Sequence, residues 1–141
     1  NFILPIDVVS SDDLKNKTII RNCKVNEIKS NHSIFDIGKK TTKLICDEIL
    51  RSKMLLWNGP MGAFEFKPFD KATMKIANTI KNNAKKLNIN SLAGGGDTIS
   101  SIKLAKAESG FKYISSAGGA FLEWLEGKQS PGVIALKENN Y

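Results

Sequence analysis

Three short glycine-rich segments contain the residues of this sequence that are best suited to chemistry. They are residues 58–62 (NGPMG), 94–98 (GGGDT) and 115–119 (SSAGG). Glycine allows backbone N–H groups to approach an anion closely, and helices predicted directly after the second and third segments would add their free N-terminal N–H groups. A single turn of this kind is usually an ordinary strand-to-helix connection. Three of them at one edge of a sheet indicate a phosphate-binding site.

Two acidic residues in or near these segments suggest what else the site could hold. Asp97 follows the glycines of the second segment, and Thr98 adds a hydroxyl group. Beside a phosphate, Asp97 would be a natural Mg²⁺ ligand, because Mg²⁺ takes one or two carboxylates together with phosphate oxygens. The alternative is that Asp97 only caps a helix. Glu65 lies between two aromatic residues, where it could accept hydrogen bonds from ribose hydroxyls or simply be solvated.

Other common catalytic and binding sites are not supported by the sequence. Neither GxxxxGK[ST] nor GxGxxG occurs, which disfavours a Walker-type loop and a dinucleotide fold. His32 is the only histidine, so neither a Ser-His-Asp triad nor a zinc cluster is indicated. Cys23 and Cys46 lie far apart without a CxxC motif, and we expect both to stay reduced in the cytosol.

Length and charge bound the possible partners. The 141 residues suffice for one hydrophobic core but not for two. A net charge of +7 suits a polyanionic partner, either nucleic acid or a phosphate-bearing ligand, without choosing between them. No signal peptide and no apolar run of about 20 residues is present, so we expect a cytoplasmic protein without a membrane partner. The chain begins at Asn1 in what resembles the middle of a structure, which predicts a fragment.

Short apolar runs alternate with amphipathic stretches, and these elements must position the glycine-rich segments. Strands are expected at residues 2–4, 7–9, 18–25, 33–36, 54–57, 90–93, 111–114 and 133–136. Helices are expected over about 41–52, over about 70–87 with Asp70 as N-cap, from about 97, and over about 121–127. This alternation predicts an α/β fold with a parallel sheet. Ligands of such sheets lie beyond the carboxyl ends of the strands.

Several motifs resemble those of the phosphoglycerate kinase family. Residues 55–65 (LLWNGPMGAFE) resemble its WNGPxGxFE segment, and residues 94–98 match its GGGDT/S motif. Residues 115–133 resemble its STGGGAxLExLEGKxLPG stretch. Residues 4–9 (LPIDVV) and 35–38 (FDIG) resemble its LPVDVV strand and LDIG turn. The resemblance covers essentially the whole chain, in the family's order and spacing. Lys39, Ile34 and Ala117 depart from it, since many members have proline, glycine and glycine there.

This resemblance implies a phosphotransferase that moves a phosphoryl group between 1,3-bisphosphoglycerate and ADP in glycolysis, giving 3-phosphoglycerate and ATP with Mg²⁺. Family members have two α/β domains, of which the N-terminal one holds phosphoglycerate and the C-terminal one holds the nucleotide. Residues 1–141 would form the C-terminal portion of the nucleotide domain, a partial Rossmann-like α/β fold with three layers, in which a parallel sheet carries helices on both faces. The substrate domain would be absent from this chain, and the complete protein would be a monomer that does not bind nucleic acid.

The resemblance also implies roles for individual residues of the nucleotide site. Glu65 would bind the ribose hydroxyls, while Asn58 and Pro60 would shape the loop near the nucleotide phosphates. Asp97 would hold the metal.

Glycines would supply the closest contacts to the phosphates in this scheme. Gly95, Gly96 and Thr98 would contact the nucleotide phosphates through N–H groups and the hydroxyl. Gly118 and Gly119 would bring a helix N-terminus to the transferring phosphoryl group, which is a catalytic role. The alternative that the sequence leaves open is a non-catalytic α/β module that binds a nucleotide or a nucleic acid.

Overall fold

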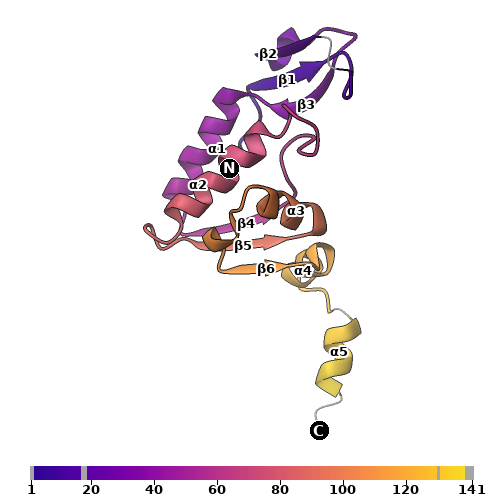
Figure 1. Cartoon of the computed structure of the whole chain (residues 1–141). Coiled ribbons are helices and arrows are strands. Elements are labelled where there is room, and N and C mark those ends of the chain that lie inside the picture. Colours follow the sequence, from indigo (N-terminus) through magenta and orange to yellow (C-terminus); the bar gives the residue numbers. More distant parts are fainter. Residues whose placement is uncertain (1, 17–18, 130, 139–141) are drawn as a thin grey trace.

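Two three-stranded β-sheets organise this chain in the computed structural model, which describes residues 2–16, 19–129 and 131–138 (Figure 1). The first sheet is antiparallel. Its central strand β1 (Asp7–Ser11) pairs with β2 (Ile20–Lys24) on one side and with β3 (Ser33–Ile37) on the other. The sequence predicts a parallel sheet, and this antiparallel sheet is separate from it.

The second sheet is parallel, and it positions the glycine-rich segments. Its strands are β4 (Met54–Asn58), β5 (Asn90–Gly94) and β6 (Tyr113–Ser115), with β5 in the middle. The helices are α1 (Lys39–Arg51), α2 (Lys71–Asn83), α3 (Gly96–Leu104), α4 (Gly118–Leu125) and α5 (Pro131–Glu138). Short 3₁₀ turns occupy Val25–Glu27 and Glu108–Gly110. The parallel strands with their intervening helices confirm the α/β class.

The core lies between one face of the parallel sheet and the helices. Trp57 of β4 and Ala93 of β5 are paired in register, and both are buried against α1, α2 and α3. The residues that pack together include Cys46, Ile49, Ile76, Ala77, Ile80, Ala84, Ile89, Ile102 and Ala107. On α1 and α2 these side chains recur every three or four residues, so each helix buries one stripe.

The opposite face of the parallel sheet is open. Side chains alternate between the two faces of a strand, so Met54, Leu56 and Tyr113 point away from the core. Met54 is 67% exposed and Tyr113 57% exposed. The described residues therefore leave this face uncovered, and the second helical layer of the predicted three-layer arrangement stays a prediction.

A buried carboxylate joins the antiparallel sheet to α1. The Thr41 hydroxyl donates to Asp7 Oδ1 at 2.7 Å, and the N–H groups of Lys40 and Thr41 donate to the same carboxylate at 3.0 and 2.8 Å. Gly38 is required here because a Cβ atom at this position would overlap the Asp7 carboxylate. Burial acts to raise the pKa of Asp7, but the hydrogen bonds from Thr41, Lys40 and Asn22 lower it to about 2.

Two expected strands are wrong. Residues 2–4 form no strand, since no neighbouring strand pairs with them in the described part of the chain. Residues 133–136 lie within helix α5 rather than in a strand. Pro131 occupies the first position of that helix, where its missing N–H costs nothing, and the helix ends in the good helix formers Ala135, Leu136, Lys137 and Glu138. The helices expected over 41–52 and 70–87 are confirmed as α1 and α2, with bounds that differ by a few residues.

Candidate functional site

The three glycine-rich segments meet at the carboxyl edge of the parallel sheet (Figure 1). Asn58 at the end of β4 pairs with Gly94 at the end of β5, and Gly94 pairs with Ser115 at the end of β6. The loops that follow these residues therefore start side by side. This is the arrangement that the sequence predicts, and it follows from the parallel direction of the strands.

Asn58, Gly95 and Gly118 come into direct contact, one from each loop. A Cβ atom at Gly118 would lie 2.6 Å from Gly95 Cα and 3.0 Å from Asn58 Oδ1. Gly95 has φ of +99°, and a Cβ atom there would lie 3.2 Å from Asn58 Oδ1. Both positions need glycine: Gly118 because the loops approach closely there, and Gly95 also because its backbone is left-handed. The loops can approach one another only because these side chains are missing.

Thr98 ties the first loop to the second. Its hydroxyl oxygen accepts a hydrogen bond of 2.7 Å from the N–H of Gly59, and the side chain is buried. The Trp57 indole N–H donates to the carbonyl of the same Gly59 at 2.5 Å, which fixes the turn that precedes Pro60. Sequence reasoning missed this role of Trp57, since nothing in the sequence distinguishes it from a core tryptophan. The predicted contact of Thr98 with a phosphate stays a prediction.

Two helix N-termini open onto this loop cluster. Helix α3 begins at Gly96 and α4 begins at Gly118. The first N–H groups of an α-helix have no partner within the helix, so they are available to an anion. A Cβ atom at Gly96 or at Gly119 would meet no atom within 4 Å, so there is free space beside both positions. The geometry suits a phosphate group, which has oxygens for several N–H donors.

Asp97 extends into solvent from the first turn of α3. The N-cap of this helix is Gly95, which has no side chain, so Asp97 is not its capping residue. The described residues contain no group of three or more His, Cys, Asp or Glu side chains that could enclose a metal ion. A cation bound by Asp97 would therefore take most of its ligands from elsewhere. Mg²⁺ fits this donor set, because it is commonly held by one or two carboxylates together with substrate phosphates and water.

Glu65 lies in the turns between β4 and α2, and its side chain is exposed. Its segment is anchored to β3: the Ala63 N–H donates to the Phe35 carbonyl at 2.7 Å, and a Cβ atom at Gly62 would lie 2.5 Å from that oxygen. The ring centroids of Phe35 and Phe69 lie 5.0 Å apart, so ring packing also attaches this segment to β3. Glu65 is thus positioned by the antiparallel sheet, separately from the loops that carry Asn58 and Asp97.

The fold is that of an α/β protein in which three glycine-rich loops and two helix N-termini meet at the carboxyl edge of a parallel sheet. The sequence model of the family "Phosphoglycerate kinase" matches residues 1–128 of the chain. The chain therefore belongs to the phosphoglycerate kinase family, as its motifs predicted.

Relatives in sequence support this assignment. The chain is 46% identical over 135 residues to the phosphoglycerate kinase of Novosphingobium aromaticivorans, which covers 95% of the chain and 34% of that protein. It is 43% identical over 134 residues to the enzyme of the same name from Zymomonas mobilis, with the same coverage of both chains. The chain thus spans about a third of the length of these relatives.

Solved structures give the same picture of the fold. The chain matches the structure of phosphoglycerate kinase from Coxiella burnetii with a TM-score of 0.81 and 34% identity, covering 89% of this chain and 32% of that one. It matches the enzyme from Pyrococcus horikoshii with a TM-score of 0.77 and 26% identity, covering 94% and 32%. The antiparallel sheet and the parallel sheet together thus have counterparts in complete kinases.

Proposed function

We propose that this chain is the C-terminal portion, residues 1–141, of the nucleotide-binding domain of a phosphoglycerate kinase. The complete protein would transfer a phosphoryl group between 1,3-bisphosphoglycerate and ADP, giving 3-phosphoglycerate and ATP in glycolysis, a cytoplasmic role. The observation that carries this proposal is the contact of Asn58, Gly95 and Gly118 from three loops at one strand edge. This contact brings two helix N-termini to one edge of the sheet, where their free N–H groups could bind an anion.

Backbone N–H groups would make most of the contacts to the phosphates. The N–H groups of Gly96 and Thr98 lie at the start of α3, and those of Gly118 and Gly119 at the start of α4. The Gly95 N–H, which the resemblance also assigned to a phosphate, donates to the Ser115 carbonyl at 3.1 Å instead. In phosphoryl transfer the protein contributes chiefly by positioning and by stabilising charge on the transferred group. Two helix N-termini aimed at one place would hold the nucleotide phosphates in line with the incoming phosphoryl group. Asn58 and Pro60 would fix the loop that closes the third side.

Asp97 would hold Mg²⁺ beside these phosphates. When bound, the metal neutralises phosphate charge and orients the oxygens that exchange the phosphoryl group. Asp97 fits this role because its carboxylate is exposed and lies in the same helical turn as the proposed phosphate donors.

Glu65 would accept hydrogen bonds from the ribose hydroxyls. Its exposed position in a segment held by β3 supports this, because the ribose lies some distance from the terminal phosphates. The 3-phosphoglycerate site would belong to the two thirds of the relatives' length that this chain does not span. We infer that the complete protein is a monomer without a nucleic-acid or membrane partner.

A chimeric protein tests this function. This chain would replace the matching third of the Novosphingobium aromaticivorans relative, and a coupled assay would measure ATP-dependent turnover of 3-phosphoglycerate. We expect turnover within about tenfold of the parent, since the loops that would bind phosphate are all present. The matched control is the same chimera with Asp97→Ala. A folded chimera that fails to bind Mg²⁺ and ADP in calorimetry would contradict the proposal.

The non-catalytic alternative makes a different prediction for the same proteins. A nucleic-acid-binding module would shift a DNA or RNA probe in a way that weakens steeply with added salt. We expect no such shift at physiological salt, because a positive net charge alone gives only weak nonspecific attraction. A strongly salt-dependent shift, together with a silent ADP titration, would favour the alternative.

A further inference from the structure

A groove of about 790 Å³ lies where the antiparallel sheet meets helices α1 and α2. It is lined by Val9, Ile20 and Asn22 of the antiparallel sheet and by side chains along both helices. None of the residues assigned above to the nucleotide lines it. Its volume falls in the range of about 300–1,000 Å³ that is usual for small-molecule sites. The groove is therefore a second place on this chain where a ligand could be enclosed.

The apolar lining of the groove is aliphatic. Its apolar residues are Val9, Ile20, Ile37, Cys46, Leu50, Pro68 and Ala72. No aromatic side chain is found among the described residues that line it, so it offers no stacking partner for a base or another planar ring. Ile20 and Leu50 remain 41% and 38% exposed, although both are branched aliphatic residues. An aliphatic ligand would cover this exposed apolar surface.

The rim of the groove is basic. Lys39 and Lys43 approach it from α1, and Lys71 and Lys75 approach it from α2, all four with exposed side chains. Lys43 is paired with Asp47 on its own helix, at 2.5 Å. The other three lysines form no ion pair with any residue in the described part of the chain. Their ammonium groups are available to the charged end of a ligand.

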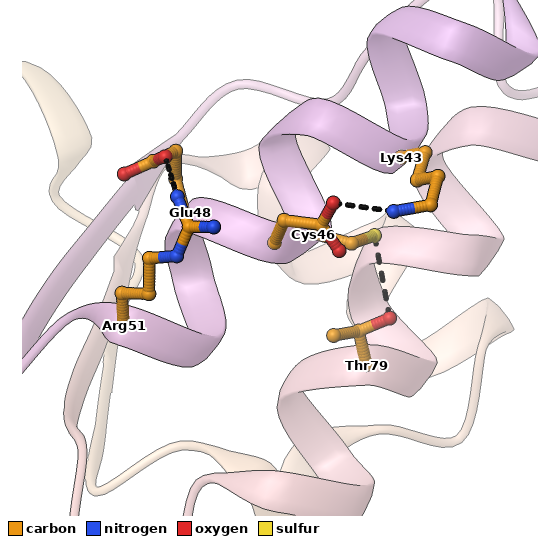
Figure 2. A network of polar contacts seen from close by, with 6 residues as sticks. Lys43, Cys46, Glu48, Arg51 and Thr79 are labelled. Carbon is orange, nitrogen blue, oxygen red and sulfur yellow. Dashed lines mark hydrogen bonds and ion pairs between the residues drawn. The ribbon is translucent and has the colours of Figure 1, made fainter.

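The acidic groups of the groove do not cancel this charge. Asp47 is engaged by Lys43. Asp36 is buried, and its two oxygens accept the N–H groups of Ile37 at 2.8 Å and Ala72 at 3.1 Å. Between the helices, Thr79 Oγ1 lies 3.3 Å from Cys46 Sγ, and this contact joins the two walls (Figure 2). The result is an aliphatic groove between two joined helices, edged by cations.

From this combination we infer that the groove binds a single long-chain carboxylate: an aliphatic tail along the apolar lining and an anionic head among Lys39, Lys71 and Lys75. Lysine is a flexible point charge, so three of them can surround a carboxylate without a fixed geometry. The inference goes beyond the kinase function and does not depend on it, because the two sites share no residue.

Titration of the chimeric protein described above with dodecanoate, below the critical micelle concentration of this fatty acid, tests the inference. Calorimetry would give Kd, and backbone amide NMR shifts would locate the ligand. We expect the shifts on α1, α2 and β2. Lengthening the tail from eight to twelve carbons should tighten Kd about threefold to fourfold per methylene, since each adds apolar surface to the groove. Dodecyltrimethylammonium, with the same tail and opposite charge, should bind at least tenfold more weakly.

Two variants and a control separate this site from general charge. The triple variant Lys39→Gln, Lys71→Gln and Lys75→Gln should weaken dodecanoate binding at least tenfold. The control Lys53→Gln, Lys85→Gln and Lys86→Gln removes the same charge from lysines outside the groove, and should change Kd less than twofold. Leu50→Glu, at an exposed position of the lining, should weaken binding at least tenfold without unfolding the chain.

Four outcomes would overturn the inference. The first is the absence of binding at every tail length by a chain whose NMR spectrum shows that it is folded. The second is equal weakening by the groove variant and the control variant. The third is a shift pattern centred on Met54 and Tyr113, which would place the ligand on the open face of the parallel sheet. The fourth is binding to anionic phospholipid vesicles without binding to monomeric dodecanoate, which would indicate a membrane surface instead.

Discussion

Two carboxylates, Asp7 and Asp97, lie in regions of opposite construction. The Asp7 side chain is only 3% exposed, and hydrogen-bond donors from Asn22, Lys40 and Thr41 surround its carboxylate. Around Asp97, backbone groups and glycines form the surroundings, and the carboxylate is exposed. The first acid has its hydrogen-bonding capacity used within the chain, while the second has capacity left for a ligand. A carboxylate whose oxygens already accept hydrogen bonds within the chain stabilises the fold, whereas one with free oxygens is suited to bind a ligand.

The largest loss of enzymatic activity is expected when the chain is assayed without the rest of the protein. The hydrogen-bond donors to Asp7 lie within the 141 residues, whereas the loop cluster would form only part of one wall of the proposed active site. We expect no detectable phosphoglycerate kinase activity from the purified chain in a coupled assay, because holding two substrates in line can be worth about 7–11 kcal/mol. The open face with Met54 and Tyr113 should also promote aggregation. Turnover within about a hundredfold of a complete relative, per folded molecule, would show that the remaining two thirds are dispensable.

Asp97→Ala should lower turnover strongly while leaving the stability of the fold almost unchanged. In the chimera described above, we expect turnover to fall about a hundredfold or more, because a metal-binding carboxylate is lost where charge must be neutralised. The free energy of unfolding should change by less than about 0.5 kcal/mol, as for other exposed positions. Steady-state kinetics and urea unfolding measure both. Turnover within threefold of the parent would remove the metal assignment.

Asp7→Asn should give the converse result. We expect the chain to lose about 2–3 kcal/mol of unfolding free energy at pH 7, because hydrogen bonds to a buried charged group are lost. The folded-state pKa of Asp7 lies below the unfolded value, so its stabilisation is present above pH 3.8 and is lost as the pH falls towards 2. The difference between variant and parent should therefore shrink in urea titrations towards pH 2. An equal difference at both pH values would mean that the charge of Asp7 is unimportant.

Glu65→Gln should have the smallest effect of the four. A ribose contact is made equally in the ground and transition states, so its loss should raise the KM for ADP about tenfold and leave kcat within twofold. Initial rates of the chimera at varied ADP would show this. If kcat fell strongly at an unchanged KM, Glu65 would take part in the chemistry and not in binding.

The loop cluster could be predicted from sequence because it depends on local patterns. Apolar runs ending in glycine indicate strands that share one edge, and the contact between Gly95 and Gly118 follows from that. The region around Asp7 could not be predicted, since Asp7 and Thr41 are 34 residues apart and neither lies in a distinctive motif. For the same reason the groove was missed: its lining residues are spread from Val9 to Asn83. Helix α5 was not predicted, because the short apolar run at residues 133–136 is equally typical of a strand.

The free space beside Gly96 and Gly119 has a consequence for mutational tolerance. At Gly38 and Gly118 a methyl group would collide with neighbouring atoms, so packing is a sufficient reason for selection against alanine there. At Gly96 and Gly119 the folded chain has room for that methyl group, and neither position needs a left-handed backbone. In a survey of all single substitutions under selection for growth, intolerance at these two positions would therefore have a different origin. It would show that a bound molecule fills this space in the cell and leaves no room for a methyl group.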